Sequence, residues 1–161
     1  MCLIIDTCAF HAVFNETDKN HFNFVAIVDW LENRRGKIVI GGSKYRKEIE
    51  TKKVTRLLRN FDQAGRLVKV NDAKVDQIAA DLKKRVPEKE FDDEHLVAII
   101  SVSRCIVICT NEKRAIPYLK RRDLYPNGVS RPKIYRTMRN ADLCCEEHIV
   151  DCCRRRVGDG S

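Results

Sequence analysis

The sequence lacks the features that mark several common classes of protein. No stretch approaches the roughly 18 consecutive apolar residues of a membrane-spanning helix. The N-terminus carries no basic segment and reaches a carboxylate at Asp6, so we expect no secretory signal and a cytoplasmic location. A glycine-rich phosphate loop and the G-x-S-x-G and H-E-x-x-H motifs are also missing, which leaves little case for the hydrolytic chemistries that they mark.

Repeats, low-complexity segments and internal linkers are missing as well, which favours a single domain. A length of 161 residues is typical of one domain and suffices to bury a core without disulfides or structural metal. We expect this domain to span residues 1–156. The glycine-containing end, residues 157–161, is expected to be a loose tail.

Positive charge is in excess, with a formal net charge of +8 at pH 7. Lysine and arginine gain affinity for phosphates by releasing counterions, so a nucleic acid is the favoured partner. The alternative is a basic surface that only keeps the protein soluble, because net charge alone does not fix a function.

Eight cysteines are many for this length, yet they do not resemble a secreted disulfide framework. We expect reduced thiols because three cysteines lie inside apolar runs: Cys2, Cys105 and Cys109. Cys144, His148 and Cys152 are spaced i, i+4, i+8 and would share one face of a helix, which could bind zinc. The short loops that usually join zinc ligands are missing, so we favour a partly buried terminal helix over residues 142–156.

Short apolar runs alternate with segments of helical periodicity along the whole chain. The predicted strands are residues 3–5, 37–40, 67–70, 105–109 and 133–136. The main predicted helices between them cover residues 22–31, 43–61, 75–82 and 92–100. The run at 105–109 is apolar on both faces, as a parallel strand covered on both sides must be. The pattern predicts an α/β fold, a three-layer α/β/α sandwich with a mostly parallel central sheet.

Several acidic residues fall where the carboxyl ends of these strands would meet. Because ligands bind at that edge of an open parallel sheet, we expect four acids to form a catalytic site: Asp6, Glu48, Asp93 and Glu112. Clustered carboxylates repel one another and need a cation, and hard oxygen ligands suit Mg²⁺ or Mn²⁺. The predicted metal ligands are Asp6, Asp93 and Glu112, with Asp92 as a further candidate.

Each acid also has a purely structural interpretation. Asp6 could cap a helix, and Glu48 could be one more charge on a solvated helix face, where Glu50 competes with it. Asp92 and Asp93 could both complement a helix dipole. Glu112 could be an ordinary loop acid.

The acidic segments resemble the motifs of the PIN-domain nucleases. Residues 3–8, Leu-Ile-Ile-Asp-Thr-Cys, resemble the opening strand of that family, which carries its first acid. The segment from Asp93 to Ala98 and the later segment from Cys105 to Glu112 resemble its third and fourth acidic motifs. The resemblance covers roughly residues 1–140, and Glu48 corresponds to the family's second acid only by its position after the second strand.

This resemblance implies a three-layer sandwich that cleaves RNA with a divalent metal, often as a homodimer. Many small bacterial members are toxins that a partner protein, the antitoxin, neutralises. Two positions depart from the family pattern, because Glu112 stands where Asp is usual and Asp92 competes with Asp93. A catalytically weak or inactive PIN-like RNA-binding module is therefore the alternative function.

Residues just beyond the fourth acid are the predicted contacts to RNA: Thr110, Asn111, Lys113, Arg114, Arg121 and Arg122. Their basic members could otherwise form a solvated face. A phosphotransfer receiver or a haloacid-type phosphatase is disfavoured, because both need a second acid near Asp6 and the segment Asp6-Thr7-Cys8 supplies one.

Overall fold

The computed structural model describes residues 1–89 and 91–154, which are built around a parallel β-sheet. The strands are β1 (Cys2–Ile5), β2 (Lys37–Ile40), β3 (Leu67–Lys69), β4 (Val107–Cys109) and β5 (Lys133–Tyr135). They lie in the order β3-β2-β1-β4-β5, and each neighbouring pair is parallel. The predicted strands and the predicted α/β class are confirmed.

The strand order reverses direction at the centre of the sheet. The chain passes from β1 through β2 to β3 at one edge and then returns to place β4 and β5 on the other side of β1. Connections leave such a switch point in opposite directions, which opens a crevice beyond the carboxyl ends of the two central strands. Asp6 lies there, with its backbone N–H donating to Cys109 O at 2.8 Å.

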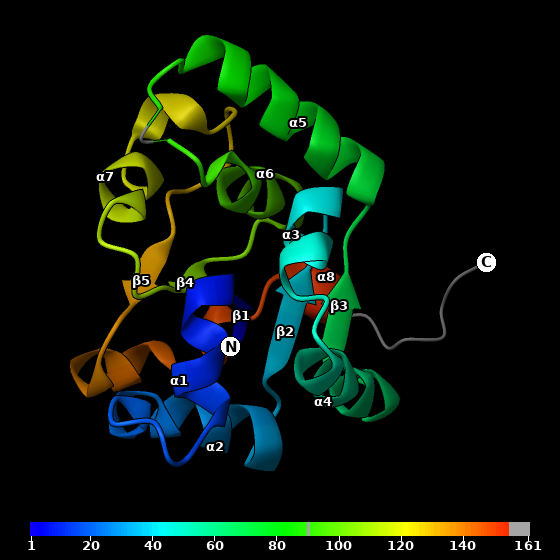
Figure 1. Ribbon diagram of the computed structural model, residues 1–161, viewed down its shortest axis with the longest axis vertical. Coiled ribbons are helices and arrows are strands. Elements are labelled where there is room, and N and C mark those ends of the chain that lie inside the picture. Colours follow the sequence, from blue (N-terminus) through cyan, green and yellow to red (C-terminus); the bar gives the residue numbers. More distant parts are fainter. Residues whose placement is uncertain (90, 155–161) are drawn as a thin grey trace.

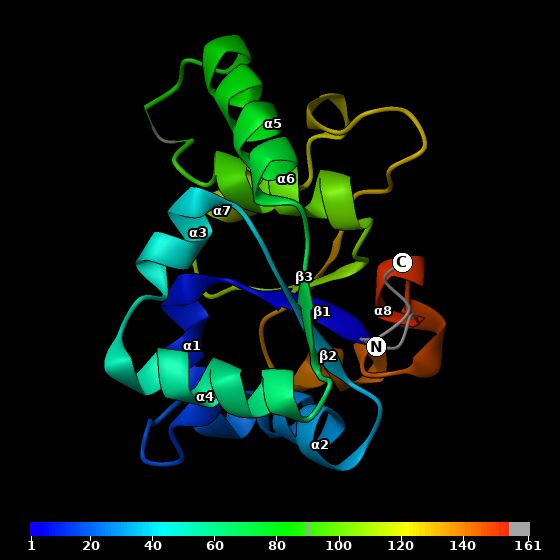
Figure 2. The same cartoon turned by 90° about the vertical axis from the view of Figure 1, so that its right-hand side faces the viewer.

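Helices cover both faces of the sheet, as Figures 1 and 2 show. One layer holds α1 (Phe10–Phe14), α2 (Val25–Asn33) and α4 (Lys52–Gln63), and the other holds α5 (Asp72–Arg85), α6 (Glu94–Ser103) and α7 (Ala115–Leu119). Helix α6 is buried along almost its whole length beneath α5. These layers form the predicted α/β/α sandwich. No helix within the described ranges is long and apolar enough to cross a membrane.

The predicted helix over residues 43–61 is two helices, α3 (Ser43–Glu48) and α4. The break needs no proline or glycine, because the Thr51 side chain accepts a hydrogen bond from Val54 N at 3.3 Å and starts a new helix. Glu48 therefore lies at the last position of a short helix. Gly42 fixes the entry to that helix, since its φ is +84° and a Cβ there would lie 2.5 Å from Val75 Cγ1.

The predicted terminal helix over residues 142–156 is wrong. The chain forms the 3₁₀ turns η4 (Met138–Leu143) and η5 (Glu146–His148), followed by α8 (Asp151–Arg154). The backbone of Cys145 has extended dihedral angles, which interrupts any helix at that residue. The Leu143 carbonyl oxygen lies 2.8 Å from the side-chain Nδ1 of His148. Cys144, His148 and Cys152 thus share no helical face. The end of the predicted domain at 155–156 and the tail 157–161 lie outside the described residues.

Candidate active site

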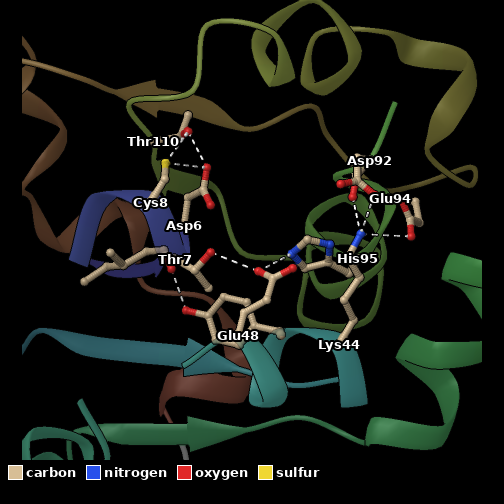
Figure 3. A network of polar contacts seen from close by, with 11 residues as sticks. Asp6, Thr7, Cys8, Lys44, Glu48, Asp92, Glu94, His95 and Thr110 are labelled. Atoms are coloured by element: carbon tan, nitrogen blue, oxygen red, sulfur yellow. Dashed lines mark hydrogen bonds and ion pairs between the residues drawn. The ribbon is translucent and has the colours of Figure 1, made fainter. Parts of the chain in front are cut away.

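Asp6 is the most deeply buried of the predicted catalytic acids, with 3% of its surface exposed. Its Oδ2 accepts a hydrogen bond from Thr110 Oγ1 at 2.5 Å and another from Cys8 Sγ at 3.2 Å (Figure 3). No described residue donates to Oδ1. The chain therefore holds one oxygen of this carboxylate and leaves the other available to a ligand.

Thr110 follows β4 and has no exposed surface. Its hydroxyl donates to Asp6 and accepts from Glu112 N at 3.0 Å, so it joins the ends of β1 and β4. The sequence favours an RNA contact for this residue. Its burial assigns Thr110 instead to positioning Asp6.

Glu48 lies across the crevice from Asp6, at the end of α3. Its Oε2 accepts from Thr7 Oγ1 at 2.9 Å and lies 3.5 Å from His95 Nε2 (Figure 3). Burial, reinforced by the charge of Lys44, lowers the pKa of His95 to about 4, so the ring is neutral at pH 7 and forms no ion pair with Glu48. The Glu48 side chain is 34% exposed, which leaves it accessible from the crevice.

Asp93 lies at the N-cap position of α6, but its side chain makes no capping hydrogen bond. Burial raises its pKa from 3.8 to about 6, and the charges of Asp6, Asp92 and Glu112 add to the rise while Lys44 opposes it. The acids are therefore close enough to repel one another, as the sequence led us to expect.

Asp92 and Asp93 are neighbours with different environments. Lys44 Nζ donates to the Asp92 carbonyl, to Asp92 Oδ1 at 3.0 Å and to Glu94 Oε1 at 3.3 Å. Asp92 is also 79% exposed at its side chain, and Lys44 lowers its pKa. A cation already neutralises Asp92, so Asp93 is the stronger ligand candidate. Sequence reasoning missed Lys44, although it lies four residues before Glu48 and thus shares a helix face with it.

Glu112 is held by its own loop. Its Oε1 accepts from Arg114 N at 3.0 Å and from Arg114 Nε at 3.2 Å, and these contacts lower its pKa. This arrangement matches the loop-acid interpretation. The carboxylate nevertheless reaches the same pocket as the other acids.

A single pocket of about 260 Å³ gathers all the predicted catalytic and metal-binding acids. Two cations also line it, and none of the lining residues belongs to the apolar core. The lining residues are Asp6, Thr7, Cys8, Glu48, Lys89, Asp92, Asp93, Glu112 and Arg114.

Most of the predicted RNA contacts lie away from this pocket. Arg121 pairs with Asp123 at 2.8 Å, and Arg122 donates to Tyr125 O at 3.0 Å. Asn111 and Lys113 are exposed on the loop beyond β4 without lining the pocket. Of the six predicted contacts, Arg114 is the one that the pocket contains.

The donor chemistry of the pocket fits a hard divalent cation, because carboxylate oxygens are the ligands that Mg²⁺ and Mn²⁺ prefer. Burial and, to a lesser degree, repulsion from the other acids raise the pKa of Asp93, and a bound cation would oppose both effects. As they stand, no three His, Cys, Asp or Glu side chains within residues 1–89 and 91–154 are arranged to hold a metal. Binding there would require side-chain rotation.

The absence of such a three-residue metal-binding group in the described ranges extends to the cysteine-rich segment near the C-terminus. All eight cysteines are free thiols, as expected. Cys145 Sγ lies 3.3 Å from His148 Nδ1, and Cys152 Sγ lies 3.6 Å from Cys153 Sγ. Cys153 also contacts Cys2, which in turn contacts Cys105, so four thiols lie together beside the start of β1.

No protein-family model matches the chain, and no curated protein matches it significantly. The PIN-domain resemblance therefore stays an expectation from the acidic motifs of the sequence.

Proposed function

We propose that this protein is a divalent-metal-dependent endoribonuclease of the PIN type, using Mg²⁺ or Mn²⁺. One observation carries the proposal: acids from four separate chain segments line one pocket at the switch point of a parallel sheet. The raised pKa of Asp93 supports it, since perturbed carboxyl groups in a cleft are typical of functional sites.

The side chains divide the work. Asp6 and Asp93 would hold the cation, with Glu112 as a more distant contact; when bound, the cation would neutralise the acids and polarise a phosphodiester. Thr110 and Cys8 orient Asp6. Glu48, whose Oε2 is held by Thr7, presents Oε1 to accept a proton from an attacking water. Arg114 and Lys89 at the pocket would attract the phosphate.

A second candidate function is an RNA-binding module with weak or no catalysis. The ion pairs of Lys44 with Asp92 and of Arg114 with Glu112 favour it, because they occupy two acids with the protein's own cations. A homodimer, a neutralising antitoxin and a cytoplasmic location stay predictions from the sequence.

Cleavage of a fluorescent single-stranded RNA by the purified chain tests the proposal. We expect cleavage with Mn²⁺, none with EDTA, and a loss of about 100-fold or more in Asp6→Asn, since even residues that only support a metal ligand are worth 10–100-fold. Glu48→Gln should also lose activity, whereas Glu50→Gln, the same change outside the pocket, should not.

RNA that binds but stays intact with every divalent metal would favour the binding module instead. Equal activity of Asp6→Asn and the parent chain would overturn the proposed site.

A further inference from the structure

A second cavity adjoins the acidic pocket, between α1 and α4. Its volume is about 240 Å³, and it shares Thr7 and Glu48 with the acidic pocket. Anything held in this cavity would therefore lie next to a group bound at the acids. The lining residues are Thr7, Phe10, His11, Phe14, Asn15, Glu48, Ile49, Thr51, Lys53, Val54 and Leu57.

The walls of this cavity are apolar and partly aromatic. Phe14 is half-buried, and its ring centroid lies 5.8 Å from that of Phe10 and 5.7 Å from that of Phe61. Val54 and Leu57 on α4 form the opposite wall and are also half-buried. Polar atoms are confined to a few positions around these walls, a pattern typical of small-molecule sites.

His11 contributes an exposed aromatic ring whose plane is fixed. Its side chain is 67% exposed, yet Nδ1 lies 2.8 Å from Asp18 Oδ2 and Nε2 lies 3.0 Å from Asn15 Nδ2. Asn15 Oδ1 accepts from Thr17, which turns the amide NH₂ toward the ring. With both nitrogens engaged, the ring faces are what His11 offers to a ligand.

We propose that this cavity binds a nucleobase of the RNA, on the nucleotide next to the phosphate held at the acids. The inference rests on the proposed ribonuclease function for that phosphate. Nucleobases have apolar faces and polar edges, and proteins bind them in single strands by stacking on aromatic rings. The His11 ring would stack on the base, and the Thr51 hydroxyl, which also lines the cavity, would meet its edge.

The charge beside the cavity favours a nucleic acid over a peptide. Lys53 lines the cavity, and Arg56 and Arg59 are exposed further along α4. Three cations on one helix attract a phosphate backbone and repel the cationic peptide that an acidic pocket would otherwise select.

Nuclear magnetic resonance tests the stacking directly, because the chain has four histidines and therefore few ring signals to assign. We expect adenosine monophosphate to shift the His11 Hε1 signal upfield by ring current, and ribose 5-phosphate to leave it unchanged. His21 and His148 serve as internal controls, and the His11 signal is assigned by its loss in His11→Ala. An unmoved His11 signal at saturating adenosine monophosphate would overturn the proposal.

Binding of a five-nucleotide RNA and of an abasic strand of equal length, both in EDTA, provides the second readout. His11→Ala should weaken the RNA roughly fivefold, the lower end of the range for base–aromatic stacking, and leave the abasic strand unchanged. Phe22→Ala removes an exposed aromatic ring outside the cavity and should change neither.

These measurements separate the two proposals. Base-dependent binding without Mn²⁺-dependent cleavage would remove the ribonuclease proposal and leave the base site in place. Cleavage by a chain that binds RNA and abasic strand equally would remove the base site alone, and a peptide would then be the better occupant.

Discussion

Asp6, Asp93 and Glu112 line one pocket, but the chain holds their carboxylates in three different ways. Asp6 is buried and accepts two side-chain hydrogen bonds. Asp93 is partly buried, its pKa is raised, and no residue in the described ranges forms a capping bond or an ion pair with its carboxylate. Glu112 is tied to Arg114. These differences lead to different expectations for each residue.

Asp93 should make the stability of the metal-free protein depend on pH. Its folded pKa of about 6 exceeds the ordinary 3.8, so its contribution to stability is fully present below about pH 4 and is lost as pH rises through 6. Asp93→Asn should therefore raise the melting temperature at pH 7.5 and change it little at pH 4. Differential scanning calorimetry in EDTA measures both.

Asp92→Asn is the matched control for that experiment. Lys44 lowers the pKa of Asp92, so the charged Asp92 carboxylate stabilises the folded protein at pH 7.5. Asp92→Asn should therefore be slightly less stable than the parent chain at that pH. Added Mn²⁺ should raise the melting temperature of the parent chain at pH 7.5 more than that of Asp93→Asn. Equal stabilisation of the two by Mn²⁺ would remove Asp93 from the site.

Glu112 should contribute less to cleavage than Asp6. Its side chain is one carbon–carbon bond, about 1.5 Å, longer than that of Asp, and Arg114 already binds its carboxylate, so a metal would have to compete with that ion pair. Glu112→Gln should reduce the rate at fixed Mn²⁺ less than Asp6→Asn does, and Glu112→Asp should retain or increase it. If Glu112→Gln cleaves at the parent rate, Glu112 serves its loop alone.

At the scale of elements, the strands were predictable because a short apolar run within each strand's own sequence is enough to indicate it. Residues 107–109 are apolar on both faces, and a chain with that pattern has to be covered from both sides. Three of the acids were predictable for the same reason, since Asp6 and Glu112 follow strands and Asp93 begins a helix. Glu48 instead ends a helix, and its place after the second strand was the weaker signal. Breaks such as the one at Thr51 depend on a hydrogen bond that competes with a continuous helix, and periodicity does not report that competition.

Contacts between distant elements were outside the reach of the sequence. Lys44 on α3 meets Asp92 and Glu94 at the start of α6, about 50 residues away. Neither local spacing nor charge patterning could pair these residues. The same holds for the positioning of Asp6 by Thr110, which depends on β1 and β4 being neighbours in the sheet.

Lys44 should stabilise the junction of α3 and α6. Glu94 is 5% exposed, and Lys44 is the charged partner of its Oε1. Lys44→Ala would leave a buried carboxylate unpaired and should lower the free energy of unfolding by about 1–3 kcal/mol in urea denaturation. Glu94→Gln should recover part of that loss when combined with Lys44→Ala.

Lys47→Ala removes the same charge from an exposed position on the same helix and should change stability by less than about 0.5 kcal/mol. If Lys44→Ala is no more destabilising than this control, the ion pair does not hold the junction.

At the scale of the whole molecule, a basic protein carries a pocket of clustered acids. The net charge of +8 attracts a polyanion from a distance, while the acids repel the phosphate at the point of contact unless a cation intervenes. The basic residues of α4 lie beside the pocket rather than in it. RNA affinity and cleavage should thus respond to different parts of the chain.

Salt should weaken RNA binding strongly, because salt competes with the phosphate contacts, and with little regard to sequence, because stacking on a base is tolerant of sequence. For a short single strand in EDTA, each neutralised phosphate should contribute about −0.7 to the slope of log affinity against log salt concentration. Lys53→Gln should reduce that slope by about one such step if Lys53 contacts the backbone beside the cavity.

Lys74→Gln makes the same change in net charge at an exposed position of α5 and should leave the slope unaltered. Equal effects of the two variants would show that net charge alone attracts RNA, and a flat response to salt would remove the phosphate contacts altogether.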